Sequence, residues 1–159
     1  MAAIEKFEDL KVWQLGRQLT ANIYSAAREG DFARDFGFRD QICRASVSIT
    51  SNIAEGFERQ SNKAFQSFLS IAKGSAGEVR SQLYAALDIG YIDDDKFHQL
   101  SAQVTEIGKM LSGLIGYLET KSSREQGGKL STSQPSASQL STSQLSTSQL
   151  STFQLSTFN

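Results

Sequence analysis

The sequence predicts an all-α protein, an antiparallel up-down-up-down four-helix bundle with a disordered C-terminal tail. Apolar residues recur three and four positions apart in four segments, which is the spacing of one face of an α-helix. The only proline is Pro135, so the first 121 residues can form long uninterrupted helices. Short connections between the four segments favour antiparallel packing of consecutive helices.

The first predicted helix covers residues 8–28. Its apolar stripe consists of Val12, Leu15, Leu19, Ile23 and Ala26, with Trp13 and Tyr24 beside it. We expect Glu8 and Asp9 to stabilise the positive end of the helix dipole. Gly30 is expected to stop the helix, because glycine is the usual residue after a helix C-terminus.

The second predicted helix covers residues 35–57 and carries two neighbouring stripes. The first stripe is expected to face the core and consists of Ile42, Ser46, Ile49, Ile53 and Phe57. The second stripe is small and polar and consists of Gln41, Ala45, Ser48, Asn52 and Glu55. Gly56 and the polar residues after it are expected to end the helix.

The third predicted helix covers residues 63–89, and Ser61 or Asn62 is expected to cap it. Its apolar face consists of Phe65, Phe68, Leu69, Ala72, Ala76, Val79, Leu83, Ala86 and Leu87. Gly74 and Gly77 lie at its centre, and each glycine costs about 1 kcal/mol relative to alanine in a helix. We therefore expect another backbone to approach this helix closely.

The fourth predicted helix follows a cap at Gly90 and opens with the aspartates of residues 93–95, as the helix dipole favours. Its heptad-type apolar seam is the clearest pattern in the sequence and consists of Phe97, Leu100, Val104, Ile107, Leu111, Leu114 and Leu118. We place the bundle in residues 1–121.

Residues 122–159 are predicted to form a disordered Ser/Thr/Gln/Leu repeat tail. The sequence Gln-Leu-Ser-Thr recurs every five residues, and this period matches neither the ~3.6 residues of a helical turn nor the ~2 of a strand. An adhesive or phosphorylatable tether is one interpretation of this tail. We favour the other, an extension translated from a tandem DNA repeat.

Residues 1–121 hold 14 basic and 16 acidic residues, a net charge of −2. This balance argues against a strongly basic nucleic-acid binder but leaves room for a local basic face. Cys43 is the only cysteine, which favours a reducing compartment, and we expect a cytoplasmic protein. The N-terminus carries no apolar signal sequence, and no apolar run approaches the ~18 residues of a membrane span.

His98 is the only histidine, so the sequence offers no His/Cys metal cluster and no Cys–His catalytic pair. We expect His98 at the surface and Cys43 as a small, partly buried side chain. No phosphate-binding glycine loop is present. The sequence thus predicts no catalytic, cofactor-binding or metal site and no small-molecule substrate.

Two sets of polar residues remain as candidate sites. The first is a structural polar seam, which would fix helix register, and it consists of Ser48, Asn52, Glu55, Ser75 and Glu78. An alternative is an enzyme in which Glu55 and Glu78 perform acid–base chemistry. The second set is a candidate nucleic-acid contact and consists of Arg39, Arg44, Lys73 and Arg80, although solvated surface charge is the simpler interpretation.

Five stretches of the sequence resemble a bacterial four-helix-bundle family first noticed as open reading frames in intervening sequences of 23S rRNA genes. They are residues 40–49, 51–57, 7–13, 68–78 and 88–92, and the resemblance covers about residues 5–120. It implies an antiparallel bundle and a homopentamer. A related branch consists of basic accessory proteins of diversity-generating retroelements, which engage a reverse transcriptase and its RNA.

The sequence departs from the family pattern at Ala33 and Thr50, where prolines are common, and the bundle is slightly acidic where the accessory branch is basic. Our leading hypothesis is a non-enzymatic, oligomeric scaffold associated with rRNA or another RNA. The alternatives are a direct nucleic-acid-binding accessory protein and, with less support, a carboxylate-dependent enzyme.

Overall fold

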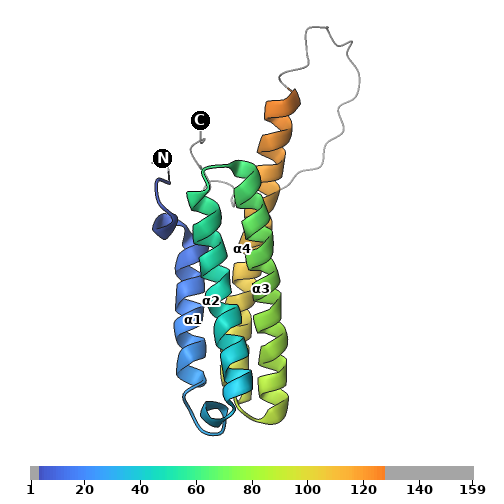
Figure 1. Cartoon of the computed structure of the whole chain (residues 1–159). Coiled ribbons are helices and arrows are strands. Elements are labelled where there is room, and N and C mark those ends of the chain that lie inside the picture. Colours follow the sequence, from blue (N-terminus) through green and yellow to red (C-terminus); the bar gives the residue numbers. More distant parts are fainter. Residues whose placement is uncertain (1–3, 128–159) are drawn as a thin grey trace, which may run out of the picture.

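Four long helices run antiparallel and side by side in the computed structural model, which describes residues 4–127 (Figure 1). The elements in chain order are η1 (Phe7–Asp9), α1 (Lys11–Ala26), η2 (Phe32–Arg34), α2 (Phe36–Glu58), α3 (Asn62–Ile89) and α4 (Asp94–Gly127). Each helix packs against the next, and α1 closes the bundle against α4. The predicted four-helix bundle is confirmed, whereas most of the predicted tail, residues 128–159, lies outside the described residues.

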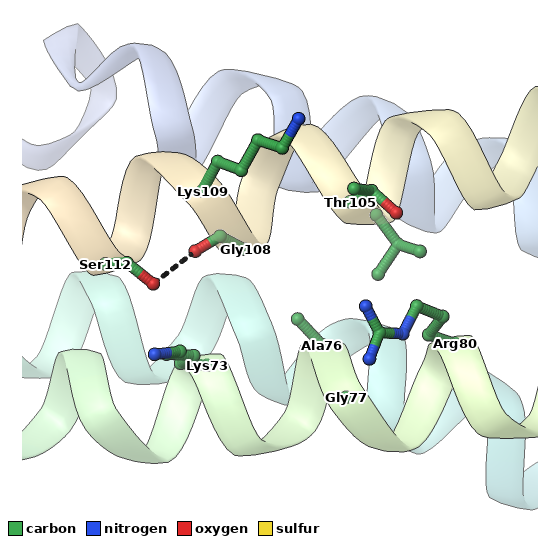
Figure 2. Close-up of a pocket in the computed structure, with 9 residues that line it drawn as sticks. Lys73, Ala76, Gly77, Arg80, Thr105, Gly108, Lys109 and Ser112 are labelled. Atoms are coloured by element: carbon green, nitrogen blue, oxygen red, sulfur yellow. Dashed lines mark hydrogen bonds between the residues drawn. The ribbon is translucent and has the colours of Figure 1, made fainter.

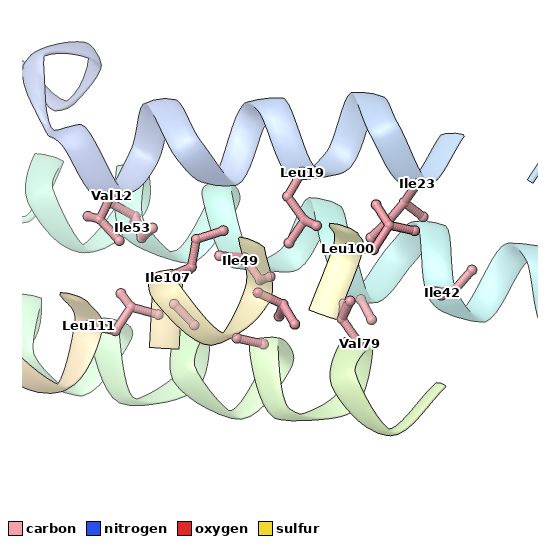
Figure 3. Close-up of a cluster of buried hydrophobic side chains, with 14 of the residues drawn as sticks. Val12, Leu19, Ile23, Ile42, Ile49, Ile53, Val79, Leu100, Ile107 and Leu111 are labelled. Atoms are coloured by element: carbon pink, nitrogen blue, oxygen red, sulfur yellow. The ribbon is translucent and has the colours of Figure 1, made fainter. Parts of the chain in front are cut away.

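The predicted apolar stripes meet in one core. Every residue of the α4 seam is buried, with exposed fractions between 0% and 7%. Figure 3 shows Leu19, Ile49 and Ile107 pointing from three different helices into the same space. Burying a side chain of this kind contributes about 1.5–3 kcal/mol. Ser46 also enters the core, and its hydroxyl donates a hydrogen bond of 2.8 Å to the carbonyl of Cys43.

The predicted caps Ser61 and Gly90 lie at the two ends of α3, and Asp35 adds a cap to α2, whereas α1 ends at Ala26, before the predicted stop at Gly30. The Asp35 carboxylate accepts a hydrogen bond of 3.0 Å from the backbone N–H of Phe38 at the start of α2. Ser61 caps α3 in the same way, through the N–H of Ala64. Gly90 ends α3 with a positive φ of 84°, a conformation that favours glycine.

The start of the first helix differs from the prediction. Glu8 and Asp9 belong to the separate 3-10 helix η1, and Leu10 then adopts an extended backbone with φ −70° and ψ 118°. Leu10 is fully buried, so the break turns an apolar side chain into the core. The α1 helix begins only at Lys11, and Tyr24, expected beside the apolar stripe, is exposed.

The last helix is longer than its apolar seam. The seam ends at Leu118, whereas α4 continues to Gly127. Figure 1 shows this end of α4 projecting beyond the other three helices. The helix therefore continues beyond its last fully buried seam residue.

The two connections at one end of the bundle are tied together. The Tyr91 hydroxyl, from the α3–α4 turn, donates a hydrogen bond of 2.9 Å to Asp35, and the Tyr91 ring stacks on Phe32 with centroids 5.1 Å apart. The backbone N–H of Phe38 and then the Tyr91 hydroxyl lower the pKa of Asp35, because both hydrogen bonds favour the carboxylate. The α1–α2 connection is thus held against the α3–α4 turn.

Close backbone approach occurs at glycines other than the predicted pair. A Cβ atom added to Gly56 would lie 2.5 Å from the Cβ of Phe68 on α3, and one added to Gly16 would lie 2.9 Å from Cγ2 of Thr50 on α2. The α2–α3 and α1–α2 contacts therefore need glycine at these two positions. Sequence inspection assigned Gly56 only to the end of its helix.

The prediction that another element of the chain packs closely on Gly74 and Gly77 is wrong. A Cβ atom at either position would meet no described atom within 4 Å. Both glycines are exposed, because they lie on α3 away from the apolar face that enters the core.

No helix of the described residues is both long and apolar enough to cross a membrane.

Replacing Gly56 with alanine is expected to lower the free energy of unfolding by about 1–3 kcal/mol, because the new methyl group overpacks the α2–α3 contact. Urea unfolding followed by circular dichroism measures the change. Gly113→Ala is the matched control, since its Cβ meets no atom within 4 Å. The control should gain up to about 1 kcal/mol from helix propensity. Equal stability of the Gly56→Ala variant and the wild type would contradict this account.

Candidate nucleic-acid interface

Three residues of the predicted polar seam form one hydrogen-bonded chain between α2 and α3. The Asn52 amide donates to the Ser48 carbonyl at 2.7 Å and to its hydroxyl oxygen at 3.0 Å. The hydroxyl oxygens of Ser48 and Ser75 are 2.8 Å apart, and Ser75 donates to the Ile71 carbonyl at 3.2 Å. Because that bond uses the only Ser75 proton, Ser48 is the donor between the two serines. The chain therefore joins the two helices at one register.

The two carboxylates of the predicted seam do not join this chain. Glu55 accepts a hydrogen bond of 2.7 Å from Arg59, and Glu78 accepts one of 3.2 Å from Gln82, each from its own helix. Both glutamates are exposed. Within residues 4–127, no group of three or more His, Cys, Asp or Glu side chains is arranged to hold a metal ion. The geometry thus gives Glu55 and Glu78 surface roles rather than a shared site.

Lys73 and Arg80 line one groove between α3 and α4, as their spacing of seven residues suggests. The groove has a volume of about 460 Å³, and α4 contributes Lys109 to its lining (Figure 2). Small residues separate the basic side chains, and they include Ala76, Gly77, Gly108 and Ser112. We call this feature the basic groove.

The three basic side chains of the groove have no ion-pair partner among the described residues, and Glu106 lies in the adjoining pocket that Lys109 also lines. No Asp or Glu residue lines the groove, and its three basic side chains make no ion pair or hydrogen bond with the described part of the chain. Figure 2 shows Arg80 reaching from α3 toward Thr105, whereas the Lys109 stem extends from α4 away from α3. Both kinds of side chain bind phosphate, Arg as a fork and Lys as a flexible point charge. An open groove with these groups suits a polyanion.

Lys109 is not among the predicted contact residues, because the apolar seam dominates the sequence pattern of α4. Gly108 and Lys109 directly follow Ile107 of the seam, so they lie beside the apolar face, where a neighbouring helix can pack. This position is the signal from which Lys109 could have been predicted. The four predicted contact residues also do not form one face. Arg39 and Arg44 line a different pocket, beside α1, and share no lining residue with the basic groove.

Comparison with known families and structures finds one matching family model and several similar solved chains. A family model described as 23S rRNA-intervening sequence protein matches residues 8–113. A solved structure of a protein of unknown function from the S23 ribosomal protein family of Bacteroides thetaiotaomicron is 27% identical, with a TM-score of 0.60. That match covers 65% of this chain and 97% of the Bacteroides chain. Comparison with curated protein sequences finds no match.

Removal of the Ser48–Ser75 hydrogen bond should destabilise the bundle modestly. Ser75→Ala is expected to cost about 0.5–1.5 kcal/mol, because it leaves the Ser48 hydroxyl without its acceptor. The double variant Ser48→Ala/Ser75→Ala should cost less than the sum of the single changes, as for residues in direct contact. Urea unfolding of the four proteins completes this cycle. Ser51→Ala, at an exposed serine of α2, is the control, and strict additivity would argue against the seam.

Proposed function

The chain belongs to the 23S rRNA-intervening sequence protein family, and on that premise we propose that it is a non-enzymatic scaffold that assembles with copies of itself and binds structured RNA. The three basic side chains of the groove, which have no ion-pair partner among the described residues, carry this proposal. The family description and the ribosomal family of the Bacteroides structure are consistent with an RNA partner. Separate surface pairs for Glu55 and Glu78 support a structural rather than a catalytic role.

The basic groove can bind RNA although the bundle as a whole is slightly acidic. Charges act over about 8–10 Å at physiological salt, so the local arrangement matters more than the net charge. Four of the carboxylates lie between residues 88 and 95, in the end of α3 and the turn into α4, and none lines the groove. With three basic side chains, the groove of one protomer binds RNA weakly, and this affinity falls as the salt concentration rises.

Assembly would multiply this weak affinity. Several grooves on one oligomer engage one RNA with an avidity that can exceed the single-site affinity by about 10²–10⁴. Family resemblance indicates a homopentamer, and this is the state that we expect. The scaffold and the RNA-binding surface are then parts of one mechanism, because the oligomer supplies the affinity that a single groove lacks.

A stripe of small residues marks the surface that we assign to self-assembly. It lies on the exposed side of α3 and consists of Ser67, Ser70, Gly74 and Ser81. Gly74 has open space around its Cβ position, and nearby Ile71 is 52% exposed. Within residues 4–127, no contact at the Cβ position of Gly74 offsets its helix-propensity cost. Close packing of α3 from a second copy would supply that compensation, since small residues let helix backbones approach.

Self-assembly predicts an oligomer at micromolar concentration in multi-angle light scattering. Gly74→Leu should shift the protein toward monomer, because the larger side chain blocks close approach at the stripe. Gly113→Leu is the matched control, since Gly113 is also an exposed helical glycine without a neighbour within 4 Å. A wild-type monomer under these conditions would refute the assembly proposal.

RNA binding predicts a strong salt dependence. The Lys73→Gln/Lys109→Gln variant should bind a structured RNA more weakly than wild type, and its log–log salt slope should be smaller by about 1–2 per protomer. Fluorescence anisotropy between about 50 and about 200 mM salt measures both effects. Lys11→Gln/Lys63→Gln removes two exposed lysines outside the groove and is the control. Wild-type affinity that does not change with salt would exclude the groove as an RNA site.

A further inference from the structure

A second basic pocket lies between the C-terminal part of α1 and the first half of α2. It has a volume of about 330 Å³ and is lined by three arginines, Arg28, Arg39 and Arg44, together with Tyr24, Asp40 and Cys43. This volume is at the small end of the range for small-molecule sites. The pocket therefore fits a compact ligand better than a continuous strand, and we call it the arginine pocket.

The three arginines of the pocket differ in how they are held. Arg39 donates a hydrogen bond of 3.0 Å to the Ala33 carbonyl and lies over the Phe36 ring, with its guanidinium carbon 4.7 Å from the ring centroid. Its other nitrogen is 3.7 Å from the Asp40 carboxylate. Arg28 and Arg44 have no ion pair or hydrogen bond to the described residues, so their guanidinium groups are available to a ligand.

The remaining lining adds an uncharged floor and an aromatic ring. Cys43 is only 7% exposed, and burial raises the pKa of its thiol, so the thiol is neutral at neutral pH. Asp40 is then the one anionic group in the lining, against three cations. Tyr24 is 38% exposed, which leaves part of its ring free for stacking. The pocket thus combines an excess charge of two with an accessible aromatic surface.

We propose that the arginine pocket binds a nucleoside 5′-monophosphate group, with the phosphate on Arg28 and Arg44 and the base against Tyr24. A phosphate monoester carries nearly two negative charges at neutral pH and accepts paired hydrogen bonds from guanidinium forks. Nucleobases stack on aromatic side chains with little regard to sequence. The same chemical group occurs in a free mononucleotide and at the 5′ end of an RNA strand. This inference does not depend on the basic groove.

Isothermal titration of the full-length protein with AMP and with adenosine tests the proposal. AMP should bind at least about tenfold more tightly than adenosine, because adenosine lacks the charged group that the two arginines bind. Equal weak binding of the two compounds would overturn the proposal, and this comparison needs no variant.

Substitutions then locate the binding. Arg28→Gln/Arg44→Gln should weaken AMP binding about tenfold or more, since both free guanidinium groups are lost. Both side chains are exposed and unpaired, so the fold should be retained. Arg17→Gln/Arg34→Gln removes two exposed arginines outside the pocket and should have no effect. Unchanged AMP affinity in the Arg28→Gln/Arg44→Gln variant would place the nucleotide elsewhere and overturn the assignment.

A third comparison identifies the source of the ligand. A short RNA with a 5′-phosphate is compared with the same RNA ending in a 5′-hydroxyl, in the Lys73→Gln/Lys109→Gln background to reduce binding at the basic groove. Tighter binding of the phosphorylated strand, lost with Arg28→Gln/Arg44→Gln, supports the pocket as a strand-end site. AMP binding without this difference supports the pocket as a site for the free nucleotide.

Discussion

Burial of the α4 seam is the constraint from which the rest of the structure follows. Its residues occupy one face of α4, and α1 and α3 pack on either side of it. Residues on the flanks of the helices do not fill the core, so small and charged side chains can occupy these positions. At the outer edge of the α3–α4 contact, Gly77 and Gly108 are too small to fill the space between the helices. A groove results, and Lys73, Arg80 and Lys109 surround it because long charged side chains extend from such a flank into water.

Periodicity predicted the helices well, because an apolar face leaves a local record in the sequence. It could not predict events that depend on three-dimensional contact. Leu10 looks like the first turn of a helix, but its burial requires an extended backbone. Gly56 looks like a helix stop, whereas its real constraint is the Phe68 side chain of the next helix. The capping residues Ser61 and Gly90 were predictable, since a cap is a local interaction.

The candidate site was predictable only in part, for a related reason. Lys73 and Arg80 share a helix, so their spacing alone places them on one face. Lys109 comes from another helix, and its place beside them depends on how α3 and α4 pack. Net charge gave little guidance, because it averages the acidic turn into α4 with the basic groove. Spacing also could not show which polar residues bond between helices. Ser48, Asn52 and Ser75 form a hydrogen-bonded chain from α2 to α3. Glu55 and Glu78 have the same spacing but each accepts a hydrogen bond from a residue four positions later in the sequence.

The bundle has two unequal ends. One end carries the α1–α2 connection and the α3–α4 turn, which the Tyr91–Asp35 hydrogen bond clamps together, while the other carries the α2–α3 turn, the start of α1 and the projecting end of α4 (Figure 1). The described residues therefore begin, at residue 4, and end, at residue 127, on the same side of the bundle. For protein engineering, a fluorescent protein or affinity tag joined directly at residue 4 or at residue 127 would lie on that side. The clamped end would stay open to its surroundings, which makes it the natural face for surface immobilisation through an introduced cysteine.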